Sequence, residues 1–138
     1  MPKPARVDPV EGQAAVEEVT RTLGELGPVG VEPAVLATAV RYFVGLLRDR
    51  APGHSVEVRI PGPAGTAFQC GEGPQHTRGT PPNVVETDPL TFFQLCTGRL
   101  GWEAAVASGS VRASGQRADL STLLPVIGDC PAPPADSQ

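Results

Sequence analysis

The sequence predicts an α+β fold, in which a small mixed or antiparallel sheet of about five strands is covered by helices on one face. Three observations lead to this prediction. Residues 8–50 place apolar side chains at helical spacing, residues 55–70 alternate apolar and polar side chains as strands do, and residues 88–125 combine short helices with one strand. With 138 residues, the chain has room for one domain with a core of its own.

We expect three regions along the chain. Residues 1–7 form a flexible arm, residues 8–128 form the single folded domain, and residues 129–138 (DCPAPPADSQ) form a disordered tail. Hydrophobic residues make up 40% of the sequence and charged residues 19%, which is typical of a globular rather than a disordered chain.

The first helix has signals at both ends. Asp8 is the expected N-cap, Pro9 takes the first helical position, and Glu11 completes a capping box. Gly27-Pro28 ends the helix, because glycine suits the left-handed cap and proline cannot continue. The apolar residues that roughly follow helical spacing are Val10, Ala14, Val16, Val19, Leu23 and Leu26.

The second helix is expected from near Pro33 to about Arg50. Arg48 and Arg50 lie in its last turn, where cations interact favourably with the helix dipole, and Pro52-Gly53 ends it. Its apolar face is broad and consists of Leu36, Ala39, Val40, Phe43, Leu46 and Leu47.

Three strands are expected next. In residues 55–60 apolar side chains alternate with charged ones, residues 61–65 form a turn, and residues 66–70 form the return strand of a hairpin. After an irregular segment, residues 83–87 form a third short strand.

The last part of the domain repeats these signals. Asp88-Pro89 starts a helix that ends at residues 97–100, and a second short helix covers residues 102–108. Residues 111–114 form a strand. We expect a final helix capped by Asp119, which carries Leu120, Leu123 and Leu124.

This order of elements resembles the sterol carrier protein family. The residues that carry the resemblance are Asp88, the turn Leu95–Leu100 (LCTGRL), the short helix before Gly109, and the strand that ends at Gly115. A bacterial, single-domain branch of the family is also similar in ATAVRYFVGLLRDRAPG (37–53) and HTRGTPPNVVETDP (76–89), so the resemblance extends over most of the chain.

The resemblance implies an apolar tunnel between the sheet and the C-terminal helices that takes sterols, fatty acids or acyl chains. It implies a binding protein without catalysis or cofactor. The ligand-binding candidates carried over from the matching segment are Phe92, Phe93, Leu95, Trp102, Val106, Leu120, Leu123 and Leu124. The same residues also suit an ordinary core, and Trp102 suits a packing anchor.

An alternative is a domain with the same fold but no tunnel, which acts as an accessory or protein-interaction module. The short final helix and the proline-rich tail replace a longer apolar terminus that closes the tunnel in many family members. A similar domain also forms the C-terminal part of mycothiol-dependent maleylpyruvate isomerases, where the metal chemistry belongs to the other domain.

The most polar segment lies before the third strand. Here His76 and Arg78 are possible contacts to a carboxylate or phosphate head group, with Glu86 tuning the histidine. Alternatively, Arg78 pairs with Glu86 or Asp88 and fixes the loop to the sheet. A small enzyme that uses the loop with His76 and Arg78 is a further, weaker alternative.

Motifs for catalysis and metal binding are lacking in the sequence. It contains no G-x-S-x-G, P-loop, G-x-G-x-x-G or H-E-x-x-H pattern. A nucleophile pair of Cys70 and His76 is conceivable but unsupported by spacing. His76 with Glu86 and Asp88 offers too few strong ligands for a metal.

Charge and cysteine content restrict partners and compartment. A net charge of −4 with a single lysine, Lys3, argues against nucleic-acid binding and against a polybasic membrane anchor. Cys70, Cys96 and Cys130 are odd in number and far apart, which indicates reduced thiols. No stretch resembles a signal peptide or a membrane span. We therefore expect a cytoplasmic protein whose partner is a hydrophobic small molecule, with a protein partner also open.

Overall fold

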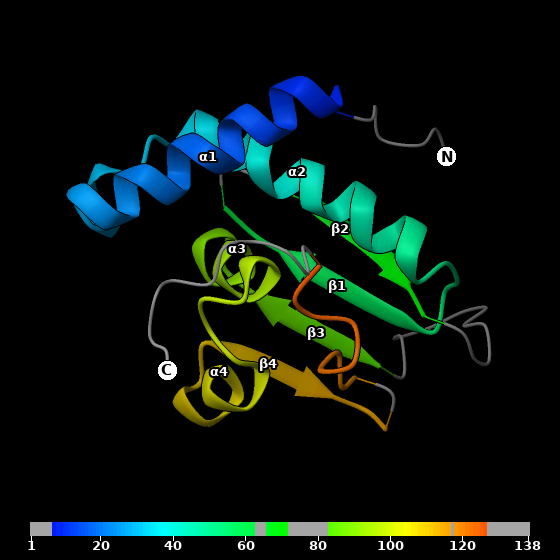
Figure 1. Cartoon of the computed structure of the whole chain (residues 1–138). Helices are drawn as coiled ribbons and strands as arrows, with labels where there is room; N and C mark the ends of the chain where they lie inside the picture. Colours follow the sequence, from blue (N-terminus) through cyan, green and yellow to red (C-terminus); the bar gives the residue numbers. More distant parts are fainter. Residues whose placement is uncertain (1–6, 63–65, 72–82, 117, 127–138) are drawn as a thin grey trace.

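The computed structural model describes residues 7–62, 66–71, 83–116 and 118–126, and it confirms the predicted α+β fold (Figure 1). Helices and strands follow the predicted order as far as the last strand. The elements are α1 (Pro9–Glu25), the 3-10 turn η1 (Pro28–Gly30), α2 (Pro33–Arg50), β1 (Val56–Ile60), β2 (Thr66–Cys70), β3 (Val84–Thr87), α3 (Pro89–Thr97), α4 (Trp102–Ser108) and β4 (Val111–Ser114).

The sheet is mixed and has the strand order β2-β1-β3-β4. β1 pairs antiparallel with β2 and parallel with β3, and β3 pairs antiparallel with β4. Val58 at the centre of β1 lies between Phe68 of β2 and Val85 of β3. The described part of the chain thus forms four strands, where we expected about five.

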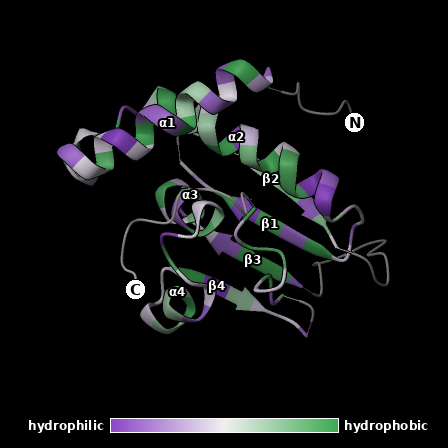
Figure 2. Cartoon of the chain, viewed as in Figure 1, coloured by the Kyte–Doolittle hydropathy of each residue, from purple (hydrophilic) through white to green (hydrophobic). Residues whose placement is uncertain are grey.

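The alternation of side chains in β1 gives the sheet one apolar and one polar face. Val56, Val58 and Ile60 are buried, whereas Glu57 and Arg59 lie on the opposite face, where Arg59 Nε donates to Glu57 Oε2 at 2.6 Å. Figure 2 shows hydrophobic and hydrophilic residues alternating along the strands in this way. The helices therefore cover the apolar face.

Aromatic side chains join the helices to the sheet. The ring centroids of Phe43 in α2 and Phe93 in α3 are 5.5 Å apart, and those of Phe68 in β2 and Phe92 in α3 are 6.2 Å apart. All four rings are buried. Contacts of this kind at these distances stabilise a core beyond the apolar area that they bury, so α3 fixes α2 relative to the sheet.

The predicted start of α1 is confirmed, but its predicted apolar face is partly wrong. Asp8 Oδ2 accepts hydrogen bonds from the amides of Val10 at 3.1 Å and Glu11 at 3.2 Å. Val10 is 74% exposed, Leu26 is 66% exposed, and Ala14 is exposed as well. The buried residues of the helix are Gly12, Ala15, Val16 and Val19.

The reason is a close approach between the first two helices. A Cβ atom at Gly12 would lie only 2.3 Å from Cδ1 of Tyr42, so α2 passes α1 closely at a position without a side chain. This contact rotates α1 so that the face with Gly12 points inward. A pattern of large apolar residues does not mark glycine as a contact residue, and the prediction therefore missed it.

The final helix predicted from Asp119 is wrong. Residues 118–126, here called the strap, form turns instead, in which Asp119 Oδ1 accepts from the Ser121 amide at 2.9 Å and the Leu123 amide donates to Leu120 O at 2.9 Å. Pro125 leaves too few residues after Asp119 for a stable helix. The strap runs across the face of the molecule that carries the helices (Figure 1).

Candidate ligand-binding site

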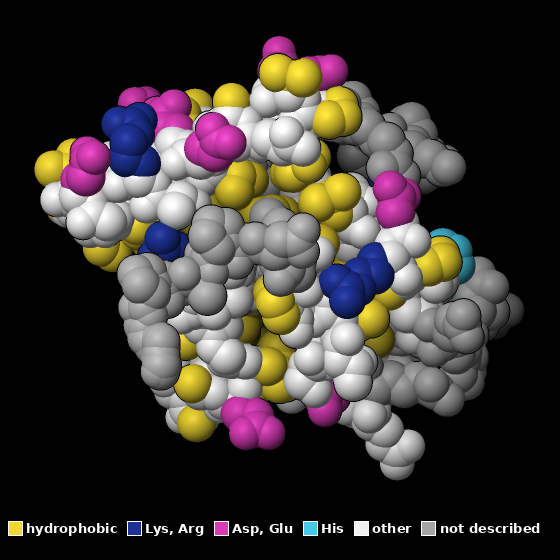
Figure 3. Space-filling view, in the orientation of Figure 1, with side chains coloured by type: hydrophobic (Ala, Val, Ile, Leu, Met, Phe, Trp, Pro, Cys, Tyr) yellow, Lys and Arg dark blue, Asp and Glu magenta, His cyan; other side chains and the backbone are white. Residues whose placement is uncertain are grey.

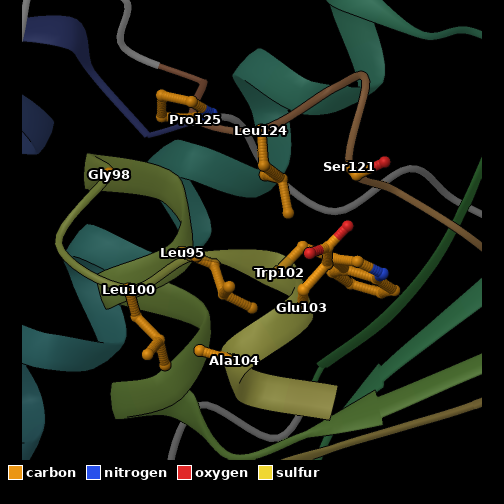
Figure 4. A pocket seen from close by; sticks show the side chains of 10 residues that line it. Leu95, Gly98, Leu100, Trp102, Glu103, Ala104, Ser121, Leu124 and Pro125 are labelled. Carbon is orange, nitrogen blue, oxygen red and sulfur yellow. The ribbon is translucent and has the colours of Figure 1, made fainter. Parts of the chain in front are cut away.

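One pocket opens between α3, α4 and the strap. Its volume is about 480 Å³, and we call it the α4 pocket. Figure 4 shows the side chains that surround it. The lining residues are Leu95, Gly98, Leu100, Gly101, Trp102, Glu103, Ala104, Ser121, Leu124 and Pro125.

The sharp turn between the two short helices creates this pocket. α3 ends at Gly98, whose φ of 80° is in the left-handed region that favours glycine. The amides of Arg99 and Leu100 donate to Gln94 O at 2.9 and 3.2 Å and thereby close the helix end. α4 begins only four residues later, at Trp102. The turn therefore holds Leu95 at the end of one helix close to Trp102 at the start of the next.

The walls of the α4 pocket are mainly apolar. Leu95 and Leu124 point toward Trp102 in Figure 4, one from α3 and the other from the strap. The polar side-chain groups in the lining are the carboxylate of Glu103, the hydroxyl of Ser121 and the indole N–H of Trp102. Such a lining suits a ligand that is largely hydrophobic and makes few polar contacts.

A second pocket lies on the other side of the strap, beside the end of α2. Its volume is about 470 Å³, and we call it the α2 pocket. It combines an apolar surface with two charged residues, Arg50 and Asp119. The lining residues are Arg50, Ala51, Pro52, Ser55, Val56, Gly71, Gln116, Asp119, Leu120, Thr122 and Leu123.

The polar groups of the α2 pocket have defined states. The hydrogen bonds that Ser121 donates from its backbone and side chain lower the pKa of Asp119 below its ordinary value of 3.8, so this carboxylate is ionised at neutral pH. Ser55 is buried, and its hydroxyl donates to Cys70 O at 3.4 Å. The pocket thus presents one cation and one anion in a lining that is polar in larger part.

Three hydrogen bonds attach the strap to the helices. Arg50 Nη1 donates to Pro125 O at 3.1 Å and to Val126 O at 3.3 Å, and the Val126 amide donates to Cys96 O at 3.0 Å. Within the strap, Leu120 is buried, whereas Leu123 and Leu124 are only partly buried. In Figure 3 hydrophobic side chains are visible below helices α1 and α2, in the region that separates these two helices from the lower part of the same face.

The structure distributes the predicted ligand-binding residues over several surroundings. Leu95, Trp102 and Leu124 line the α4 pocket, and Leu120 and Leu123 line the α2 pocket. The other three predicted residues line neither of these pockets: Phe92 and Phe93 belong to the core, and Val106 is 41% exposed. The suggested head-group residues, His76 and Arg78, lie outside the described residues.

Sequence reasoning missed several residues of the two pockets. Leu100, which lines the α4 pocket, belongs to the LCTGRL turn, and the sequence does contain a signal for it. A leucine that follows a helix-ending glycine commonly packs back against that helix. Arg50 was interpreted only through the helix dipole, and nothing in the sequence indicated that it reaches the strap 75 residues further on.

The two described cysteines are poor candidates for nucleophiles. Cys70 and Cys96 are free and buried, and burial raises the pKa of Cys70 to about 11 and that of Cys96 well above 9.0. Both thiols are therefore protonated at neutral pH, and a thiol attacks far more slowly than a thiolate. Within the described ranges, His, Cys, Asp and Glu side chains form no group of three or more that could hold a metal ion. None of the described helices is both long and apolar enough to cross a bilayer.

Comparison with known proteins identifies a family for this chain. No curated protein matches the sequence. The model of a protein family described as bacterial SCP (sterol carrier protein) orthologues matches residues 32–126, from the residue before α2 to the end of the strap. This range covers more than half of the chain and includes every residue that lines the two pockets. The chain belongs to this bacterial sterol carrier protein-like family.

Proposed function

We propose that this protein binds a hydrophobic small molecule, such as a sterol, a fatty acid or an acyl lipid, and that it does so without catalysis. The α4 pocket holds the apolar part of the ligand. The observation that carries the proposal is the apolar wall of this pocket, where Leu95, Trp102 and Leu124 converge from three separate elements. Membership in a family of sterol carrier protein orthologues supports a lipid or sterol carrier function in general.

Size and chemistry of the pocket support this proposal. Small-molecule sites commonly have volumes of about 300–1,000 Å³, and the α4 pocket has about 480 Å³. Removing apolar ligand surface from water is favourable by about 25 cal/mol per Å², which an apolar wall provides without specific hydrogen bonds. Among the described residues, no histidine lines either pocket, so the described lining of these pockets offers no imidazole as a general base.

The first experiment is native mass spectrometry on freshly purified protein, combined with organic extraction and lipid analysis. We expect a lipid that copurifies in stoichiometric amount. A ligand-free mass that stays unchanged when fatty acids or sterols are added would contradict the proposal. It would instead favour the accessory or protein-interaction module.

A matched pair of variants tests the location of the site. Trp102 is the only tryptophan, so its fluorescence reports ligand binding to the α4 pocket directly. We expect Leu124→Gln to lower the affinity for a fatty acid about tenfold, because a polar group then replaces an apolar contact with the ligand. The corresponding loss of binding free energy is roughly 1.4 kcal/mol or more. Val106→Gln is the control, because Val106 is exposed and lines neither pocket. An equal loss in both variants would place the ligand elsewhere.

A further inference from the structure

The polar side-chain groups of the α4 pocket are mainly hydrogen-bond acceptors. Glu103 is the only charged residue among the described residues that line the pocket, and its carboxylate can only accept. Within the described part of the chain, no cation forms an ion pair with Glu103 and no group donates a hydrogen bond to its side chain. This negative charge is therefore free to interact with a ligand.

Ser121 adds an acceptor to the same pocket rather than a donor. A hydroxyl has one proton to donate, and the Ser121 side chain donates it to Asp119, whose Oδ1 also accepts from the Ser121 amide at 2.9 Å. The lone pairs of the hydroxyl oxygen remain for the pocket. Asp119 lines the α2 pocket, but these hydrogen bonds hold its negative charge close to the strap wall of the α4 pocket as well. An anionic head group is repelled by these charges, whereas a cationic one is attracted.

Trp102 provides an aromatic surface beside this negative charge. It precedes Glu103 at the start of α4, and both residues line the pocket, with the indole partly buried (Figure 4). The face of an indole attracts a cation that lies within about 6 Å of its centre, and tryptophan is the best aromatic residue for this contact. Quaternary ammonium groups are recognised by aromatic rings in this way.

We infer that the α4 pocket selects a cationic amphiphile, that is, an alkyl chain with a quaternary ammonium or protonated amine as its head. The head lies against Trp102 and Glu103, and the chain lies along the apolar walls formed by Leu95, Leu100 and Leu124. This inference rests on the proposed function, and it narrows the ligand class to hydrophobic cations. A fatty acid binds the same pocket through its chain alone.

The positive charges near the α4 pocket lie outside its lining. Arg50 donates to the carbonyl of Pro125 at 3.1 Å but does not line the pocket, and Figure 4 shows Pro125 and Trp102 on different sides of it. Arg99, in the turn between α3 and α4, is exposed and does not line the pocket either. A cationic head is therefore directed toward Trp102 and Glu103 rather than toward Pro125.

The test compares three ligands with the same decyl chain, namely decyltrimethylammonium, decanol and decanoate, by isothermal titration calorimetry below their micellar concentrations. We expect the wild-type protein to bind the cation about fivefold or more tightly than decanoate. Glu103→Gln should lower the affinity for the cation about fivefold, the loss expected for an exposed ion pair, and leave that for decanol within about twofold. Trp102→Leu keeps the wall apolar and should weaken the cation about threefold more than decanol.

The comparison of ligands separates this role of Glu103 from a structural one. Glu103 also lies in the first turn of α4, where a carboxylate interacts favourably with the helix dipole. A loss of that interaction would weaken the binding of all three ligands alike. Glu17→Gln is the control, because it removes the same charge from an exposed glutamate of α1 that lines neither pocket, and it should change each affinity by less than about twofold.

Two results would overturn the inference. The first is that the wild-type protein binds decanoate as tightly as decyltrimethylammonium, which decides the question even if the variants fail to fold. The second is that Glu103→Gln weakens the cation and decanol equally or changes neither. Failure of the wild-type protein to bind any of the three ligands would instead refute the proposed function itself.

Discussion

Helix α2 and the strap lie on the same side of the sheet, but they are held in different ways. α2 has Ala39, Val40, Phe43 and Leu47 fully buried, and it is regular over 18 residues. The strap has no helix or strand, keeps Leu123 and Leu124 partly exposed, and is attached by three hydrogen bonds. Regions with few buried contacts open at low free-energy cost, and ligand-binding segments are drawn from them. We infer from this contrast that α2 is the scaffold of the candidate site and that the strap is its less firmly held wall.

Removing the central ring of α2 should have the largest effect. Phe43→Ala deletes a ring that is fully buried and 5.5 Å from the ring of Phe93. We expect the free energy of unfolding to fall by about 3–5 kcal/mol, because the deletion removes apolar contact and leaves a cavity. Urea denaturation measures this change, with Val29→Ala, at a side chain that is 94% exposed, as the control that should change stability by less than about 0.5 kcal/mol. A small loss for Phe43→Ala would contradict the role of α2 as scaffold.

A pair of glycines in α1 tests how tightly that helix fits the scaffold. Gly12→Ala places a Cβ atom 2.3 Å from Tyr42 Cδ1 and 2.8 Å from its Cβ, so the two helices must move apart. We expect a loss of about 1–3 kcal/mol, as in overpacked cores. Gly24→Ala meets no atom within 4 Å and should instead stabilise the protein by about 0.5–1 kcal/mol, since alanine favours the helix. Thermal unfolding of both variants measures the difference, and stabilisation by both would show that the close approach is absent in solution.

Acid should loosen the strap before it affects the scaffold. Because the pKa of Asp119 is lowered in the fold, its contribution to stability is fully present above the ordinary value of 3.8 and is lost as pH falls through the lowered pKa. The side chain is exposed, so the effect is small, on the order of a few tenths of a kcal/mol. Trp102 fluorescence, recorded from neutral pH to below 3.8, follows the strap side of the α4 pocket. Asp119→Asn should remove this pH dependence, and an unchanged acid transition in that variant would assign it to another group.

The same contrast explains how much of the fold could be predicted from the sequence. α2 was predicted from Pro33 to Arg50 because its start, its end and its apolar spacing all agree. The strap was mistaken for a helix because Leu120, Leu123 and Leu124 have helical spacing. Spacing alone does not show that Pro125 follows Asp119 after too few residues for a stable helix. A pattern specifies an element only where its length also allows it.

The candidate site was predicted less completely than the fold. Phe93 and Leu95 are both apolar residues of α3, yet one packs in the core and the other lines the α4 pocket. The sequence cannot separate them because both surroundings require an apolar side chain. Arg50 could not be assigned for a different reason, since its contact to the strap arises only when residues 75 positions apart meet in the fold.

Among the described residues the sheet is open, with β2 and β4 at its edges, and this has a consequence for solubility. An edge strand offers unpaired backbone groups to other chains and so invites aggregation. In β4 this risk is limited in two ways: the strand has only four residues, and Arg112 at its second position is exposed and charged. A second copy that added a strand along β4 would have to place a chain beside this arginine. A short, charged edge of this kind lets a small protein keep an open sheet without joining it to others.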